Sequence, residues 1–313
     1  MALKEKDLIG LQYTTADEIA EILETAATMK SLLMQGAKKM PHLQGKSIIS
    51  LFYENSTRTR MSFELAGKYL GASTSNISAA ASSVQKGETL IDTGRTLDAM
   101  GTDIIIMRHP MSGAAKLLAE NVGAGVINAG DGMHEHPTQA LLDMFTMKDK
   151  LKTLEGINVA IIGDIYHSRV ARSNVWGLNK MGANVTVCGP FTMLPVELDR
   201  TGAKVTPDMK SAVKDADVVM GLRIQKERQK GGAYPSVREY HHFYGINENV
   251  MKLAKKNALV MHPGPINRGI EIASVYADGG QSVINEQVTN GLAVRMALLF
   301  LLTRGKKKNE TIN

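Results

Sequence analysis

Hydroxyl and guanidinium side chains crowd one short segment in the first quarter of the chain. Residues 55–60 (NSTRTR) hold three hydroxyls and two arginines. The preceding apolar run, Ser47–Phe52, has the length and composition of a buried strand. From Arg60 onward, apolar side chains recur at helical spacing, and Gly71 stands where the helix is expected to end. Helix-end amides combined with hydroxyls and an arginine fork suit an anion of phosphate type.

A plainer interpretation of the same segment is a Ser/Thr helix cap followed by two solvated arginines. Cations at the N-terminal end of a helix oppose its dipole, however. A chain that places Arg58 and Arg60 there is expected to bind an anion, so we favour the phosphate site.

Four further polar clusters are predicted at the carboxyl ends of strands, where ligands bind in open parallel sheets. Each alone has an ordinary explanation: a surface arginine, a helix-cap histidine or a solvated basic run. Together they predict a two-substrate pocket between domains, for a phosphorylated carbonyl compound and a dicarboxylate. The clusters contain Arg108, His136 with Gln139, Asp164 with Arg169, and Arg223 with Gln225.

The alternation of strand and helix patterns predicts an α/β fold of two domains, each a mostly parallel sheet flanked by helices. We expect the first domain at 1–148 and the second at 149–285. The C-terminal helix, within 286–313, is expected to pack back on the first domain. Gly130, Asp131 and Gly132 are interpreted as a flexible loop.

Composition narrows the class of protein. The 313 residues, 43% hydrophobic and 22% charged with a net charge of +6, are typical of a globular protein with acidic small-molecule substrates. Few aromatic residues accompany the basic ones, so we expect no nucleic-acid partner. Cys188, the one cysteine, is expected to be buried and inert, in a reducing compartment. The lack of a signal peptide and of a membrane-length apolar run predicts a cytoplasmic protein that does not bind membranes. We predict no metal and no cofactor, since no metal-ligand spacing is present.

Six motifs, spread from about residue 45 to the end of the chain, resemble the aspartate/ornithine carbamoyltransferase family. They are FYENSTRTRMSFE, KGETLIDT, MRHP, NAGDGMHEHPTQALLD, RIQKER and HPGPINRG. The combination of STRTR with HPTQ at this separation is specific to the family.

The resemblance implies carbamoyl phosphate as the first substrate. The segment that opens the second helix would bind its phosphate, and three side chains would hold its carbonyl oxygen. These three side chains and Arg58 are the implied catalytic residues. The implied phosphate ligands are Ser56, Thr57, Arg58, Thr59 and Arg108; the carbonyl ligands are Thr59, Arg108 and His136; Gln139 and the backbone of Pro263, Gly264 and Pro265 would meet the amide nitrogen.

The resemblance also implies a homotrimer whose sites are shared between subunits. Ser82 and Lys86 would reach the neighbouring subunit's site, and Lys86 would bind the amino-acid substrate with Arg169, Arg223 and Gln225. Ornithine enzymes of the family carry other motifs, and cationic residues suit a β-carboxylate and repel an ammonium group, so the predicted acceptor is L-aspartate. Association with regulatory chains or a dihydroorotase is left open.

Three other functions remain as alternatives. A carbamoyltransferase for ornithine or another amino acid is the nearest. A dinucleotide-dependent α/β enzyme would need a Gly-x-Gly-x-x-Gly turn, and of these glycines only Gly163 is present, at the turn that ends the strand at 158–163. A non-enzymatic protein that binds phosphorylated metabolites or nucleic acid is the third.

Overall fold

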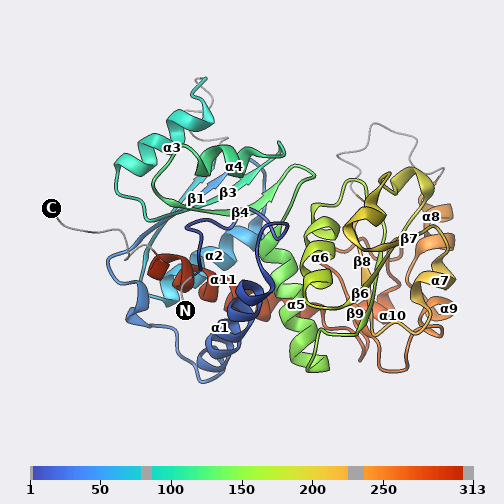
Figure 1. Ribbon diagram of the computed structural model, residues 1–313. Helices are drawn as coiled ribbons and strands as arrows, with labels where there is room; N and C mark the ends of the chain where they lie inside the picture. The colour runs from blue at the N-terminus through green and yellow to red at the C-terminus, as the bar shows by residue number, and fades with distance from the viewer. Residues whose placement is uncertain (1–2, 79–86, 225–235, 306–313) are drawn as a thin grey trace. The chain divides into compact units, whose positions relative to one another are not determined.

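The computed structural model describes residues 3–78, 87–224 and 236–305, and the chain folds into two α/β units (Figure 1). Unit 1 comprises the residues up to Leu141 and those from Thr289 onward, and unit 2 comprises Leu142–Val288. The division falls inside helices α5 (Pro137–Leu151) and α11 (Ile284–Gly305). The domain limits expected at residues 148 and 285 lie a few residues away and stay a prediction.

The described part of unit 1 is built on a four-stranded sheet in which every neighbouring pair is parallel, in the order β2-β1-β3-β4. Because parallel strands all end at one edge, the segments that follow β1, β3 and β4 emerge side by side. The strands are β1 (Ser47–Phe52), β2 (Ser73–Ser78), β3 (Ile104–His109) and β4 (Gly125–Asp131).

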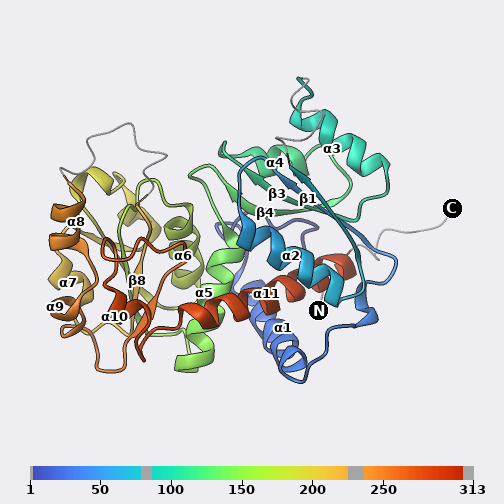
Figure 2. The ribbon, with the colours of Figure 1, turned by 180° about the vertical axis from the view of Figure 1, so that it is seen from behind.

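Helices cover both faces of this sheet. One face carries α1, α2 and α11, and the other carries α3 and α4 (Figures 1 and 2). Apolar side chains from β1, β3, α3 and α4 interlock on the second face, where Leu51, Ile105 and Leu118 are fully buried. The helices are α1 (Ala16–Met34), α2 (Thr57–Tyr69), α3 (Leu90–Ala99) and α4 (Ala114–Ala119), with a 3-10 turn at Pro41–Leu43.

The C-terminal helix α11 packs on unit 1, as expected. Arg295 Nη1 donates to Ser62 Oγ of α2 at 3.0 Å, and its guanidinium lies 5.2 Å from the centre of the Phe63 ring. Phe300, one turn and a half further on, meets the His42 ring edge-on at 5.4 Å. These contacts join α11 to the helix that follows β1 and to the 3-10 turn that precedes β1.

The described part of unit 2 is built on a five-stranded parallel sheet in the order β7-β6-β5-β8-β9. A core of apolar residues from β5, β8, β9, α7, α9 and α10 fills one face, and Cys188 at the end of β6 is buried in it. The strands are β5 (Asn158–Ile162), β6 (Asn184–Cys188), β7 (Lys204–Thr206), β8 (Val218–Gly221) and β9 (Leu259–Met261). The helices are α6 (Arg169–Lys180), α7 (Met209–Val213), α8 (Val237–Tyr244), α9 (Glu248–Met251) and α10 (Ser274–Ala277), with 3-10 turns at Phe191–Met193 and Leu198–Thr201.

Two local predictions were wrong. Helix α2 begins at Thr57, not near Arg60, because Ser56 adopts the extended N-cap conformation and Arg60 N already donates to Ser56 O at 3.1 Å. Gly130 and Asp131 are not a flexible loop but the end of β4, where Asp131 is fully buried. In addition, β7, α8 and α10 were not predicted. Strand β7 has three residues and helix α10 is a single turn, so both are too short to show a periodic pattern of apolar residues.

Candidate functional site

The turn between β1 and α2 leaves the helix N-terminus open to a ligand. Ser56, the N-cap residue, makes no side-chain cap hydrogen bond, so its hydroxyl is not committed to the helix. The first intrahelical bond starts at Arg60 N, so the amides of the preceding turn lie outside the helix ladder. Thr57 and Arg58 are exposed, whereas Thr59 is buried. This arrangement combines amides, hydroxyls and a guanidinium, which together suit an oxyanion.

Arg108 stands beside this turn because β3 is the neighbour of β1. Phe52 and Arg108 are register partners, and Tyr53 N donates to Arg108 O at 2.8 Å. The Arg108 guanidinium is oriented from two sides: Nε lies 3.2 Å from Glu54 Oε2, and Nη1 donates to Ala129 O of β4 at 3.3 Å. The side chain is mostly buried, with 15% of its surface exposed, so its direction is set by these contacts.

His136 is held at the start of α5 by a turn that two buried carboxylates organise. Asp131 accepts from Gly113 N at 2.8 Å and from Asn128 Nδ2 at 2.7 Å, and lies 3.1 Å from His134 Nδ1. Glu135 accepts from two amides of the N-terminal segment, Leu11 N at 2.7 Å and Gln12 N at 3.1 Å. The turn between β4 and α5 is therefore tied to two other parts of unit 1.

His136 itself is 5% exposed, and its carbonyl accepts the first amides of α5, Gln139 N at 3.0 Å and Ala140 N at 3.3 Å. Pro137 occupies the first helical position, where a missing N–H costs nothing. The Nδ1 atom of His136 lies 3.5 Å from Thr138 Oγ1. Unit 1 thus places the Ser56–Thr59 turn after β1, Arg108 near the carboxyl end of β3, and His136 with Gln139 after β4.

Unit 2 places the two arginines predicted for its site, Arg169 and Arg223, after β5 and β8, which are neighbours in the sheet. Arg169 opens α6, one residue after the N-cap Ser168, whose Oγ accepts from Ala171 N at 3.1 Å. Arg169 is 4% exposed, and a guanidinium buried to this extent is typical of a functional or an ion-paired site. Arg223 follows β8 by two residues and is half-buried.

The single glycine of the β5–α6 turn has a packing role. Gly163 has φ 139°, and a Cβ there would lie 2.9 Å from Leu222 Cβ and 3.0 Å from Leu222 O. The glycine therefore permits the close approach of the segments that follow β5 and β8. Packing alone therefore explains why a glycine stands here, and no bound pyrophosphate is needed to account for it. This weighs against the dinucleotide alternative.

Gly264 and Pro265 lie directly after β9, the next strand in the sheet. Gly264 has φ 64°, in the left-handed region that favours glycine, and the Gly264–Pro265 peptide bond is cis. His262, at the start of this loop, donates its backbone N–H to Gln287 Oε1 at 3.0 Å. The predicted residues Ser82, Lys86 and Gln225 lie outside the described residues.

Two titratable groups near the carboxyl ends of β1 and β3 have displaced pKa values. Burial lowers the pKa of His109, whose Nδ1 accepts from Met111 N at 3.0 Å. Burial raises the pKa of Tyr53, whose ring lies 4.7 Å from that of His109. Both groups therefore favour their neutral forms in the folded protein.

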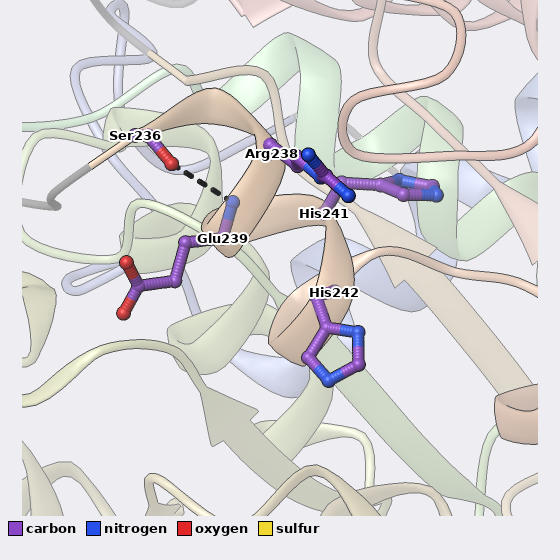
Figure 3. Close-up of a pocket in the computed structure, with 5 residues that line it drawn as sticks. All are labelled: Ser236, Arg238, Glu239, His241 and His242. Carbon is purple, nitrogen blue, oxygen red and sulfur yellow. Dashed lines mark hydrogen bonds between the residues drawn. The ribbon is translucent and has the colours of Figure 1, made fainter.

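A hollow of about 390 Å³ lies along α8 in unit 2 (Figure 3). None of the predicted site residues lines it. Figure 3 shows the side chains of Arg238, His241 and His242 pointing in different directions rather than toward one centre. The lining residues are Ser236, Arg238, Glu239, His241 and His242.

In the part of the chain that the structure describes, no group of three or more His, Cys, Asp or Glu side chains is placed to hold a metal ion. Across the same residues, no helix combines the length and apolar character needed to cross a membrane.

Sequence reasoning missed the buried polar groups that support the site. Asp131 and Glu135 organise the turn before His136, and Asp143 and Gln287 are linked to the loop at 262–265. The only signal in the sequence is the presence of charged or amide residues within otherwise apolar runs, as at Asp143 in QALLDMF. Such a signal shows that a partner is needed without showing which one.

Comparison with known proteins covers both units. The family model described as the carbamoyl-P binding domain of aspartate/ornithine carbamoyltransferase matches residues 6–149, and the model of the Asp/Orn binding domain matches residues 155–302. The aspartate carbamoyltransferase catalytic subunit of Acetivibrio thermocellus is 66% identical over 313 residues, which is 100% of each chain.

Two solved structures share the fold along nearly the whole chain. Ornithine carbamoyltransferase from Pyrococcus furiosus has a TM-score of 0.86 and 33% identity, covering 96% of this chain and 98% of its own. Aspartate transcarbamoylase from Trypanosoma cruzi, in complex with carbamoyl aspartate and phosphate, has a TM-score of 0.85 and 32% identity, covering 95% and 96%.

Proposed function

Because the chain belongs to the aspartate/ornithine carbamoyltransferase family, we propose that it transfers the carbamoyl group of carbamoyl phosphate to the α-amine of L-aspartate. The products are N-carbamoyl-L-aspartate and phosphate, which places the reaction in de novo pyrimidine biosynthesis. The observation that carries the proposal is the sheet edge of unit 1, where the open N-terminus of α2, Arg108 and the turn to His136 stand at the carboxyl ends of β1, β3 and β4.

The phosphate of carbamoyl phosphate binds at the start of α2. Ser56 and Thr57 offer hydroxyls, Arg58 offers a guanidinium, and the first-turn amides complete the set of donors. Arg108, fixed by Glu54 and Ala129, contacts both the phosphate and the carbonyl oxygen.

Three donors share the carbonyl oxygen, namely Thr59, Arg108 and His136. All three are largely removed from water, which strengthens their hydrogen bonds to a developing negative charge. Gln139 accepts from the carbamoyl NH2, as do the backbone carbonyls of the loop that contains Gly264 and Pro265.

L-Aspartate binds to unit 2. Arg169 and Arg223 follow adjacent strands and suit bidentate capture of the two carboxylates, with Gln225 and Lys86 as further ligands. The 66% identity to a subunit named for aspartate supports this acceptor over ornithine.

The reaction is a direct displacement. The neutral α-amine attacks the carbamoyl carbon and forms a C–N bond, and the carbonyl π electrons move to the oxygen held by Thr59, Arg108 and His136. The tetrahedral intermediate collapses, the C–O bond to phosphate breaks, and the departing phosphate takes the amine proton. His136 acts as a hydrogen-bond donor to the oxyanion, not as a base.

The active assembly is a homotrimer in which Ser82 and Lys86 of one subunit serve a neighbour's site, and the protein works in the cytoplasm. The family relationship along the whole chain supports this assembly. Association with regulatory chains or a dihydroorotase is outside the proposal.

A colorimetric assay for N-carbamoyl-aspartate, run in parallel with ornithine as acceptor, tests the function. The proposal predicts product with aspartate and at most traces with ornithine. Equal or greater product with ornithine would reverse the assignment of the acceptor.

A further inference from the structure

A chain of buried hydrogen bonds crosses unit 2 from α6 to the loop after β9. Asn174 Nδ2 of α6 donates to Asp143 Oδ2 of α5 at 2.9 Å. Gln287 Nε2 of α11 donates to Asp143 Oδ1 at 2.7 Å, and Gln287 Oε1 accepts from His262 N at 3.0 Å. Asn174 and Asp143 are fully buried, and Gln287 and His262 are 3% and 2% exposed.

The series of hydrogen bonds continues into the loop after β9 through the His262 ring. Nδ1 accepts from Gly264 N at 2.8 Å, so this nitrogen carries no proton. Nε2 lies 3.4 Å from Glu271 Oε1, which also accepts from Asn267 N at 2.6 Å. The loop is therefore held at His262, at Gly264 and at Asn267 by groups that connect to one another.

Asp143 sets the direction in which the Gln287 amide lies between α5 and His262 N. A carboxylate accepts only, so it turns the amide NH2 of Gln287 toward itself and leaves the amide oxygen for His262 N. An amide in place of Asp143 has only one acceptor for two donors, so it would force one mismatch of donor against donor, at Asn174, at Gln287 or at His262. Buried mismatches of this kind are costly, because no water replaces the lost partner.

We propose that Asp143 and Gln287 are positioning residues that set the direction of the backbone carbonyls in the loop of His262, Pro263, Gly264 and Pro265. This inference rests on the proposed function, in which that loop meets the reacting nitrogen atoms. Asp143 and Gln287 touch no substrate; they act through the backbone of His262.

Positioning of this kind has a large effect on turnover. Carbonyl groups that accept from the carbamoyl and amino nitrogens must lie within hydrogen-bond distance in the transition state, and a misplacement of about 1 Å can cost about 100-fold. Phosphate binding, assigned to the start of α2 in unit 1, does not depend on the loop. Loss of the hydrogen bonds between Asp143, Gln287 and His262 should therefore lower kcat without changing the affinity for phosphate.

The test is a pair of substitutions that reverse the direction of one bond. Asp143→Asn alone leaves two amides facing each other, and Gln287→Glu alone brings two buried carboxylates together. In Asp143→Asn/Gln287→Glu, the new amide accepts from Asn174 and donates to the new carboxylate, which accepts from His262 N. The double variant has the size and the net charge of the wild type, and it keeps a donor facing an acceptor in the bonds at Asn174, Gln287 and His262 N.

We expect each single variant to lose about 10- to 100-fold in kcat, with the inhibition constant for inorganic phosphate within about twofold of the wild type. The double variant should recover to within about fivefold of wild-type kcat. A folded double variant no better than the worse single variant would overturn the proposal, as would a double variant that does not fold or single variants with wild-type turnover.

Gln281→Glu is the matched control. Gln281 Nε2 donates to Lys256 O at 3.2 Å and to Ala258 O at 3.0 Å, at the opposite end of β9 from the loop. This variant should lower the melting temperature and leave kcat of the folded protein unchanged. An equal loss of kcat in Gln281→Glu would reduce the effect to general destabilisation and overturn the positioning role.

The failure of the proposed function would be recognised separately. If the wild type formed no N-carbamoyl-aspartate, the reaction assignment would fall. The melting temperatures of the single and double variants would still show whether Asp143 and Gln287 are coupled, because restored hydrogen bonds restore stability with or without turnover.

Discussion

At the scale of single residues, the site combines groups whose environments differ sharply. Arg58 is exposed at the start of α2, whereas Thr59 and His136 are almost fully buried. An exposed guanidinium can meet an incoming anion in water, and buried donors can hold a developing charge where water does not compete. The physical distinction follows the proposed division between binding phosphate and stabilising the oxyanion.

His109 provides a residue-scale prediction about pH. Burial lowers its pKa in the folded protein, so the unfolded chain binds a proton that the folded chain does not at pH values just below the ordinary value of 6.5. Stability should therefore fall as the pH drops through this range and return as the pH rises. In His109→Asn, whose amide oxygen can still accept from Met111 N, urea unfolding should show a shallower dependence between about pH 5 and 6.5. An unchanged dependence would contradict the assignment.

Cys188 provides a second prediction at the residue scale, about thiol reactivity. Burial, followed by the nearby Asp208 carboxylate, raises the pKa of its thiol to about 12. The thiolate is the reactive form, so the native protein should not react with a thiol reagent at pH 8. In denaturant, one thiol per chain should titrate at once, since the sequence has one cysteine. Rapid reaction of the native protein would show that the end of β6 is open to solvent.

At the scale of elements, helix caps decide where the site groups lie. Helix α1 begins at Thr15 with a reciprocal capping box, in which Thr15 and Glu18 satisfy each other's backbone amides. The N-cap residue of helix α2, Ser56, makes no side-chain cap bond. The contrast suits their roles, because a helix whose first amides receive a ligand has no need of a side chain there.

Thr15→Ala tests the structural cap. It should lower the free energy of unfolding by about 1 kcal/mol, because one acceptor for the first-turn amides is lost. Thr28→Ala, an exposed position within the same helix, is the control and should change stability by less than about 0.5 kcal/mol. Equal effects of the two substitutions in urea unfolding would contradict a specific cap.

The elements also show what a sequence can and cannot predict. The strand Ser47–Phe52 was predicted to the residue, since its apolar run is uninterrupted. The start of α2 was placed three residues late because Arg and Thr at 57–60 give no apolar period; the backbone conformation of Ser56 decides it. Asp143 and Gln287 could not be paired in advance, because they are 144 residues apart in the chain and meet only through the fold.

At the scale of the whole molecule, each unit presents its polar groups at the carboxyl edge of a parallel sheet. Unit 1 carries the proposed carbamoyl-phosphate ligands at the carboxyl ends of β1, β3 and β4, and unit 2 carries the proposed aspartate ligands after β5 and β8. In open parallel sheets, ligands bind beyond the carboxyl ends of the strands, and this rule accounts for both sets of residues. It also explains why polar clusters recur in the sequence after successive strands.

Shared sites predict complementation between two inactive variants. Arg58→Ala disables a subunit's own phosphate site, and Lys86→Ala disables its contribution to a neighbour. After subunit exchange in an equal mixture, about a quarter of the sites should be intact in hybrid trimers and should recover activity in proportion. No recovery despite exchange proven by mass spectrometry would refute the shared site.

The most direct test of the whole account is the turnover of Arg58→Ala compared with Lys68→Ala. Both remove one positive charge from α2, but Lys68 pairs with Glu64 in the last turn, about 15 Å along the helix from Arg58. We predict that Arg58→Ala loses at least about 100-fold in kcat while keeping its fold, and that Lys68→Ala stays within about twofold. Near-wild-type turnover in Arg58→Ala, or an equal loss in both variants, would contradict the assignment of the phosphate to the start of α2.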